Sequence, residues 1–340
     1  MFKGQKILIF NNHSEASLSH CLLYGRRLGM EVFFGAIDFL EKCGVSSLLY
    51  SGAYPEKEQK ADGSVTWSHS VPYNFRTGYF GVLDNVTVRD IFFNEFIDTK
   101  FDYILLTLPE LLPIANVLKR YQPGITVLAY SGNVGMVYPN NMPLICTSKP
   151  DYRRHAGTKL LITHELPLQM THIPIKDNDK YIVRSCLNHM SAYPWHRSLL
   201  EFEQIIGEVG YKLVIGGFDG RDNDGFRGLE DAIHNHYSAC RAGIHMKHID
   251  GYGLCVSHWL LSGRPLLIGF KYYEQNIMFP LIEEWGVDIP YDDAERMAEI
   301  FCSTVDEFTP ARSEDQSKDA SVFFDYDGDE QRVRSFLSSL

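Results

Sequence analysis

The chain has 340 residues, with 45% hydrophobic and 22% charged side chains, and is long enough for two domains of ordinary size. Its formal net charge of −11 argues against a surface built to bind nucleic acid or anionic lipid, because such surfaces need clustered Lys and Arg. No apolar run is long enough to span a bilayer, the N-terminus does not read as a signal peptide, and the seven cysteines are scattered singly. We therefore expect a cytoplasmic protein without an integral membrane span.

The first half alternates between strand and helix patterns. Residues 6–10 predict a strand, 18–30 an amphipathic helix and 31–37 a second strand, whereas the Gly-, Pro- and aromatic-rich stretch 50–81 predicts hairpins or a long binding loop. Apolar residues at helical spacing predict one helix over 87–100. Further strands are expected at 101–108, 125–132 and 143–148, with a helix at 110–122. These strands are apolar on both faces, as parallel strands covered by helices must be.

The second half repeats this rhythm after a short polar, proline-containing segment at 168–180. The predicted elements are strands at 180–187, 211–218, 243–248 and 264–270, and helices at 196–210, 229–242 and 253–263. This pattern predicts two doubly wound α/β domains, an N-terminal one over 1–175 and a C-terminal one over 176–325. Ligands of such sheets bind at the carboxyl ends of the strands, so a cleft between the two sheets is the expected site.

The stretch HIDGYGLCVSHWLLSGRPLLIG, residues 248–269, carries the most informative pattern. Gly251 and Gly253 fall where a helix begins, and the amides at a helix start favour an anionic group such as phosphate. Asp250 and His258, eight positions apart, face one ligand if the chain bends at the glycines. The alternative is a buried strand-helix-strand corner in which His258 is a core histidine.

This register resembles the sugar-donor segment of the GT-B fold glycosyltransferases, in which two Rossmann-like domains face each other across a cleft. The resemblance implies that Asp250 approaches the donor sugar and that the amides of Gly251, Tyr252 and Gly253 approach the diphosphate. His258 takes the place of a second acid that holds the nucleoside ribose. The sequence departs from the family pattern twice, because Asp250 and His258 each replace a glutamate.

The same resemblance implies further donor-binding residues on the second domain. Lys247 is a point charge near the phosphates, and Gly216 and Asp219 help to line the side of the base or ribose. The other implied residues are Asn188, His189 and Arg197 at the diphosphate, and Gly217 and Phe218 beside the base or ribose. The alternatives are that Arg197 is a solvated helix residue and that GGFDG only ends a strand. The last helix, at 326–340, is expected to pack back on the first domain.

The first domain is expected to bind the acceptor. His13 follows the first strand and is the candidate base of an inverting mechanism, because imidazole titrates near neutral pH. Glu110, after another strand, is an alternative base, and a retaining mechanism would need no base there. Other candidate acceptor-side residues at strand ends or in the aromatic loop are Asn12, His69, Ser131 and Asn133.

The predicted activity is transfer of a hexose or pentose from a nucleotide-diphosphate sugar, a UDP-sugar above all, to an acceptor hydroxyl, with no further cofactor and no metal. No phosphate-loop, zinc-protease or serine-hydrolase motif is present. The acceptor is open: a glycan, a lipid-linked sugar, a small molecule or, as in phage-type enzymes, a modified DNA base. Two other functions also stay open, a sugar-nucleotide epimerase of the same fold and a non-catalytic nucleotide-sugar-binding module.

Overall fold

The computed structural model describes residues 2–10, 20–35, 38–45, 57–59, 65–67, 88–132, 134–163, 170–175, 182–186, 193–216, 237–238, 240–248 and 250–340. The chain divides into two compact units. Unit 1 consists of Met1–Pro167 and Tyr326–Leu340, and unit 2 of Leu168–Asp325. No helix within the described ranges is both long and apolar enough to cross a membrane.

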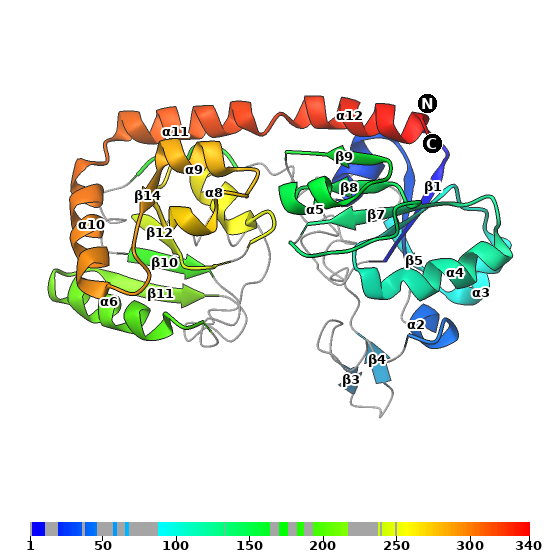
Figure 1. The fold of residues 1–340 in the computed structure, drawn as a ribbon, viewed down its shortest axis with the longest axis horizontal. Coiled ribbons are helices and arrows are strands. Elements are labelled where there is room, and N and C mark those ends of the chain that lie inside the picture. Colours follow the sequence, from blue (N-terminus) through cyan, green and yellow to red (C-terminus); the bar gives the residue numbers. More distant parts are fainter. Residues whose placement is uncertain are drawn as a thin grey trace. The chain divides into compact units, whose positions relative to one another are not determined.

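Unit 1 is built on a parallel seven-stranded sheet in the order β5-β2-β1-β6-β7-β8-β9 (Figure 1). Its central strands are apolar and buried, so helices must cover both faces. The order reverses between β1 and β6, which makes the carboxyl ends of these two strands a topological switch point. The strands are β1 (Lys6–Phe10), β2 (Glu31–Gly35), β5 (Val88–Ile91), β6 (Tyr103–Leu106), β7 (Thr126–Ser131), β8 (Leu144–Cys146) and β9 (Lys159–Leu161).

The helices of unit 1 pack an aromatic core against this sheet, in which Phe39 contacts the rings of Phe10, Phe93 and Phe96. They are the π-helix η1 (Cys21–Arg27), α2 (Asp38–Lys42), α3 (Phe93–Asp98), the 3-10 helix η4 (Pro109–Leu111), α4 (Leu112–Tyr121) and α5 (Lys149–Arg154). A separate hairpin pairs β3 (Lys57–Gln59) with β4 (Val65–Trp67).

The predicted single helix over 87–100 is wrong. Val88–Ile91 forms the edge strand β5, which pairs in parallel with β2, and the helix α3 begins only at Phe93. Residue spacing alone could not separate the two, because the apolar residues Ile91, Phe93 and Phe96, all buried here, suit one helix as well as a strand followed by a helix. Pairing with β2 decides in favour of the strand.

The last helix, α12 (Tyr326–Ser338), belongs to unit 1. The carboxylate of its buried Asp329 accepts hydrogen bonds from the backbone N–H (2.9 Å) and the hydroxyl (2.8 Å) of Thr163, which follows β9. Arg27, at the end of η1, forms ion pairs with Asp327 and Glu330. A buried carboxylate and surface ion pairs thus attach the C-terminal helix to the first unit.

Unit 2 is built on a parallel five-stranded sheet in the order β11-β10-β12-β13-β14. The order reverses between β10 and β12, so the carboxyl end of β12 lies beside a second switch point. The strands are β10 (Ile182–Cys186), β11 (Lys212–Gly216), β12 (Ala242–His245), β13 (Leu266–Ile268) and β14 (Gly286–Asp288).

Two groups of helices accompany this sheet: α6 packs against α10, and α11 packs against α8 and α9 (Figure 1). Buried side chains of α6 and α10 share one core with those of β11 and β12. The helices are α6 (His196–Glu208), α8 (Leu254–Ser262), the 3-10 helix η8 (Phe270–Tyr272), α9 (Phe279–Trp285), α10 (Ala294–Glu307) and α11 (Pro310–Phe323).

Residues 170–175 are part of unit 2, although the sequence placed them at the end of the first domain. The backbone N–H of Ile173 donates to Ser262 O (3.1 Å), and the buried Arg264 guanidinium donates to Pro174 O (3.4 Å). His172 forms a hydrogen bond with the Ser313 hydroxyl (2.9 Å). The expected boundary at residue 175 therefore differs from the observed one after Pro167, because these contacts tie the segment to α8 and α11.

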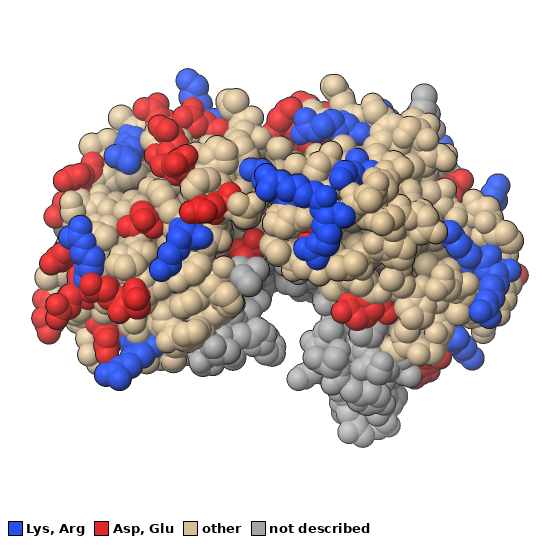
Figure 2. All heavy atoms as spheres, viewed as in Figure 1, with Lys and Arg blue, Asp and Glu red and all other residues tan. Residues whose placement is uncertain are grey.

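The net charge is confined to one unit. Unit 1 carries 18 Lys and Arg against 18 Asp and Glu, whereas unit 2 carries 14 against 25. Figure 2 shows acidic side chains gathered over α6 and α10 of unit 2. An anionic ligand of unit 2 would therefore need positive groups and N–H donors placed locally, because the net charge of the unit repels it.

Candidate functional site

The candidate site is the segment that joins β12 to α8. It follows the strand beside the switch point of unit 2, where ligands of parallel sheets bind. Gly253 precedes the first residue of α8 in a left-handed conformation (φ 82°), which glycine adopts without steric cost. A Cβ atom at this position would lie 3.0 Å from Asp250 Oδ2. Gly253 is thus required both by its φ and by the nearness of the carboxylate.

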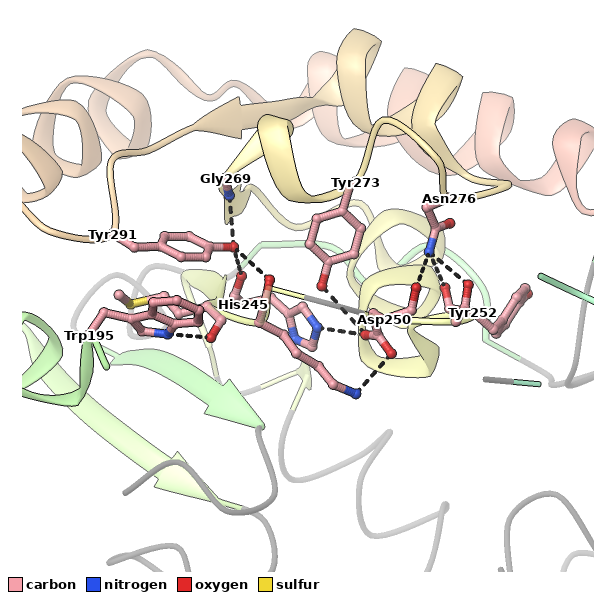
Figure 3. A network of polar contacts seen from close by, with 11 residues as sticks. Trp195, His245, Asp250, Tyr252, Gly269, Tyr273, Asn276 and Tyr291 are labelled. Atoms are coloured by element: carbon pink, nitrogen blue, oxygen red, sulfur yellow. Dashed lines mark hydrogen bonds and ion pairs between the residues drawn. The ribbon is translucent and has the colours of Figure 1, made fainter. Parts of the chain in front are cut away.

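Asp250 is the charged centre of this site (Figure 3). Its Oδ2 atom lies 3.0 Å from His245 Nε2 and accepts a long hydrogen bond from the Tyr273 hydroxyl (3.5 Å), while Oδ1 accepts from Lys247 Nζ (2.9 Å). Burial raises the pKa of Asp250, but the hydrogen bond from His245 and the charge of Lys247 outweigh it and hold that pKa at about 2. Asp250 is therefore a buried carboxylate that stays ionised at neutral pH.

Lys247 connects the buried carboxylate to solvent. Its side chain is 30% exposed, whereas that of Asp250 is 7% exposed. Burial lowers the pKa of Lys247, but the negative charge of the neighbouring Asp250 raises it by more. The net shift is upward, so the amine is protonated at neutral pH. The pair presents a positive group at the surface of an otherwise acidic unit.

Aromatic side chains hold the end of β12 in place. The Tyr291 hydroxyl donates to His245 O (2.7 Å) and accepts from Gly269 N (2.9 Å), and Trp195 Nε1 donates to Met246 O (2.6 Å). The rings of Trp195 and Tyr291 are also in contact, with centroids 5.0 Å apart. These bonds tie the end of β12 to the segments that precede α6 and that follow β13 and β14, and so position the backbone from which Asp250 projects (Figure 3).

His258 lies inside α8 and is buried. Its Nδ1 atom is 3.0 Å from the Tyr237 hydroxyl, and burial lowers its pKa to about 4. Among the described contacts, none joins His258 to the Asp250 cluster. The eight-residue spacing thus places Asp250 in the turn before α8 and a neutral His258, paired with a tyrosine, in the middle of that helix.

Arg197 lies in the first turn of α6, where its side chain is 89% exposed and paired with Glu201 (2.8 Å). Within unit 1, Glu110 is exposed in η4, just after β6. Ser131 ends β7 and is buried, and its hydroxyl donates to Asp151 Oδ2 (2.7 Å). The remaining predicted residues lie outside the described residues: Asn12, His13, His69, Asn133, Asn188, His189, Gly217, Phe218 and Asp219.

The sequence did not predict four residues that contact the predicted ones. In unit 2 these are His245 and Tyr273, which contact Asp250, and Asn276, which contacts Gly251; in unit 1 it is Asp151, which contacts Ser131. A local signal existed for His245, which ends a strand five residues before Asp250. Asp151 lies in the first turn of α5 after the capping residue Ser148, a pattern visible in the sequence SKPD. Tyr273 and Asn276 carried no such signal, because they reach the turn from more than 20 residues away.

No described group of three or more His, Cys, Asp or Glu side chains could hold a metal ion. The chemical capacity of the site is instead that of an ionised carboxylate and an ammonium group beside a glycine turn that opens a helix. Helix-start amides and an ammonium group favour an anion, and a carboxylate accepts hydrogen bonds from hydroxyl groups.

The whole chain is similar to solved glycosyltransferase structures. HepE from Anabaena in complex with UDP-glucose is 12% identical with a TM-score of 0.61, over 98% of this chain and 100% of that one. TarM is 11% identical with a TM-score of 0.56, over 99% of each chain. The pneumococcal O-GlcNAc transferase GtfA in complex with UDP and GlcNAc is 9% identical with a TM-score of 0.54, over 99% of each chain.

These similarities establish the fold, which is the GT-B fold expected from the sequence. No protein-family model matches the sequence, and neither does any curated protein.

Proposed function

We propose that this chain transfers a hexose or pentose from a nucleotide-diphosphate sugar, with a UDP-sugar as the donor class, to a hydroxyl group of an acceptor. The observation that carries the proposal is the ion-paired Asp250 placed directly before the turn that opens α8, at the carboxyl edge of the sheet of unit 2. The GT-B fold supports it, as do the UDP and UDP-glucose held by the Anabaena structures.

In this proposal each group has a distinct task. The ionised Asp250 accepts hydrogen bonds from the hydroxyl groups of the donor sugar. Lys247 and the amides of residues 251–253 lie beside the diphosphate and stabilise the negative charge that grows on it as the glycosidic bond breaks. Because these groups stabilise the departing diphosphate, the proposed reaction needs no metal ion. The acceptor binds to unit 1, where Glu110 and the undescribed His13 are the candidate bases.

Binding and turnover of nucleotide sugars test the proposal directly. Calorimetric titration with UDP-glucose, ADP-glucose and GDP-mannose is expected to give tightest binding for the uridine nucleotide, and incubation with donor is expected to release UDP. Asp250→Asn should lower the rate of UDP release by about 100-fold, the typical effect of removing one charge-stabilising group. The exposed Glu283→Gln on α9 is the control and should leave the rate unchanged.

Two outcomes would overturn the proposal. Absence of binding for every nucleotide sugar would remove it altogether. Conversion of the bound sugar to its epimer, with the nucleotide still attached and no free UDP, would favour the epimerase alternative.

A further inference from the structure

The side chain of Asn276 organises the turn that precedes α8. Its Nδ2 atom donates to the carbonyl oxygens of Asp250 (3.4 Å), Gly251 (3.0 Å) and Tyr252 (3.1 Å), so two protons are shared among three acceptors (Figure 3). Its Oδ1 atom accepts from the backbone N–H of Met278 (2.8 Å). Asn276 is 4% exposed, so water cannot easily replace these bonds. The direction of three consecutive peptide units thus depends on one buried carboxamide.

The contact with Asn276 also fixes the direction of the neighbouring backbone N–H groups. In a planar trans peptide, the C=O of one residue and the N–H of the next point in opposite directions. Because the carbonyls of residues 250–252 turn toward Asn276, the N–H groups of residues 251–253 turn away from it. Among the described residues, the N–H groups of Gly251 and Gly253 make no hydrogen bond. The turn therefore presents donors on the side opposite to Asn276.

We propose that Asn276 is the positioning residue that aims these N–H groups at the phosphates of the donor, an inference that rests on the proposed function. Only a carboxamide fits both parts of this task, because Nδ2 must donate to the three carbonyls while Oδ1 accepts from Met278. Unit 2 has a net charge of −11, so recognition of a diphosphate there depends on local donors of this kind.

Two substitutions test the role of the carboxamide. Asn276→Asp keeps the size of the side chain and the acceptor for Met278, but it places oxygen against the three carbonyls and turns the peptides away. Asn276→Ser removes most of the donor capacity without adding charge, and so separates peptide reorientation from simple repulsion of the ligand. The probes are UDP and uridine, which differ only in the diphosphate.

Gln316→Glu is the matched control. The Nε2 atom of the fully buried Gln316 also donates to three carbonyls, those of Trp259, Leu260 and Arg264, at the other end of α8. Gln316→Glu places an oxygen against these three carbonyls, and so disturbs α8 at its C-terminal end and not at the turn before it. It is expected to lower the melting temperature while leaving the preference for UDP over uridine unchanged.

The measured quantity is the ratio of the dissociation constants of uridine and UDP, determined by competition calorimetry on folded protein. Both Asn276 variants are expected to lower this ratio by about 10–100-fold, the range for the loss of charge-assisted hydrogen bonds, with uridine affinity unchanged. If Asn276→Asp does not fold, Asn276→Ser carries the test.

An unchanged ratio in Asn276→Ser, or an equal change in Gln316→Glu, overturns the positioning role while the proposed function stands. Failure of the unmodified protein to bind UDP at all removes the proposed function, and this inference with it.

Discussion

The two units organise their candidate binding edges with side chains of opposite hydrogen-bonding character. In unit 2, the amide of Asn276 donates to backbone carbonyls of the turn at 250–252. In unit 1, the buried carboxylate of Asp151 accepts from the N–H groups of Gly135 (3.0 Å) and Met136 (3.2 Å), from the Ser131 hydroxyl (2.7 Å) and from Arg154 (2.8 Å). One edge is held by a donor and the other by an acceptor.

This difference determines which backbone groups remain for a ligand. Holding carbonyls turns the N–H groups of residues 251–253 to the side opposite Asn276 in unit 2, whereas holding N–H groups turns the preceding carbonyls to the side opposite Asp151 in unit 1. N–H groups suit an anionic diphosphate, and carbonyls suit the hydroxyl groups of an acceptor. The comparison therefore agrees with the proposed assignment of donor to unit 2 and acceptor to unit 1.

The largest effect is expected from removing the carboxylate of unit 1. Asp151→Ala removes a fully buried acceptor from two backbone N–H groups, the buried Ser131 hydroxyl and the 45% exposed Arg154, which should lower the free energy of unfolding by about 3 kcal/mol. Asp250→Ala should cost less, about 2 kcal/mol, because Asp250 accepts from fewer groups and one of its contacts, from Tyr273, is long. Urea unfolding measures both, and hydrogen exchange at 134–138 assigns the first loss to unit 1. Equal losses of unfolding free energy in the two variants would contradict the expected difference between the two units.

Acid should weaken the unit 2 site in a defined pH range. The pKa of Asp250 is lowered from 3.8 to about 2, so its contribution to stability is complete above about pH 4 and is lost as the pH falls toward 2. A shift of this size corresponds to about 2 kcal/mol. The difference in urea midpoint between the unmodified protein and Asp250→Asn should therefore shrink between pH 5 and pH 2.5. A constant difference across this range would contradict the ion-paired arrangement.

The smallest effects on stability are expected from removing one hydroxyl donor from Asp151 and one from Asp250. Ser131→Ala removes a buried bond of 2.7 Å to Asp151 and should cost about 1 kcal/mol. Tyr273→Phe removes a contact of 3.5 Å to Asp250, at the limit of hydrogen-bond length, and should cost less than about 0.5 kcal/mol. Chemical denaturation compares the two, and a larger loss for Tyr273→Phe would reverse the expected order.

The sequence predicted the regular elements well where one residue pattern permitted one structure. The buried apolar runs 6–10 and 126–131 are parallel strands, and the amphipathic segments 112–121 and 196–208 are helices, all as expected. Prediction failed at 87–100, where the same apolar residues suit a strand and a helix. The edge of a sheet is where this ambiguity is greatest, because only pairing with a neighbour resolves it.

In the candidate site too, the sequence predicted residues that are close along the chain and missed those that tertiary contacts bring in. Asp250 and the two glycines were predicted from their spacing before a helix, and Lys247 from the resemblance; the structure pairs Lys247 with Asp250 beside the turn that precedes α8. His258 was placed by the same spacing, and the structure pairs it with Tyr237. Asn276 and Tyr273 were missed because their contacts with the turn depend on how η8 returns to the sheet edge.

What the sequence by itself determined is local: the alternation of strands and helices, and a glycine turn preceded by an acid. Such features follow from residue periodicity and from the conformational freedom of glycine, which do not depend on distant parts of the chain. Only the tertiary structure decided which side chains complete the turn, because hydrogen bonds between Asn276 and residues 250–252 require segments 24–26 residues apart to meet. The direction of the backbone N–H groups is thus a property of the folded unit.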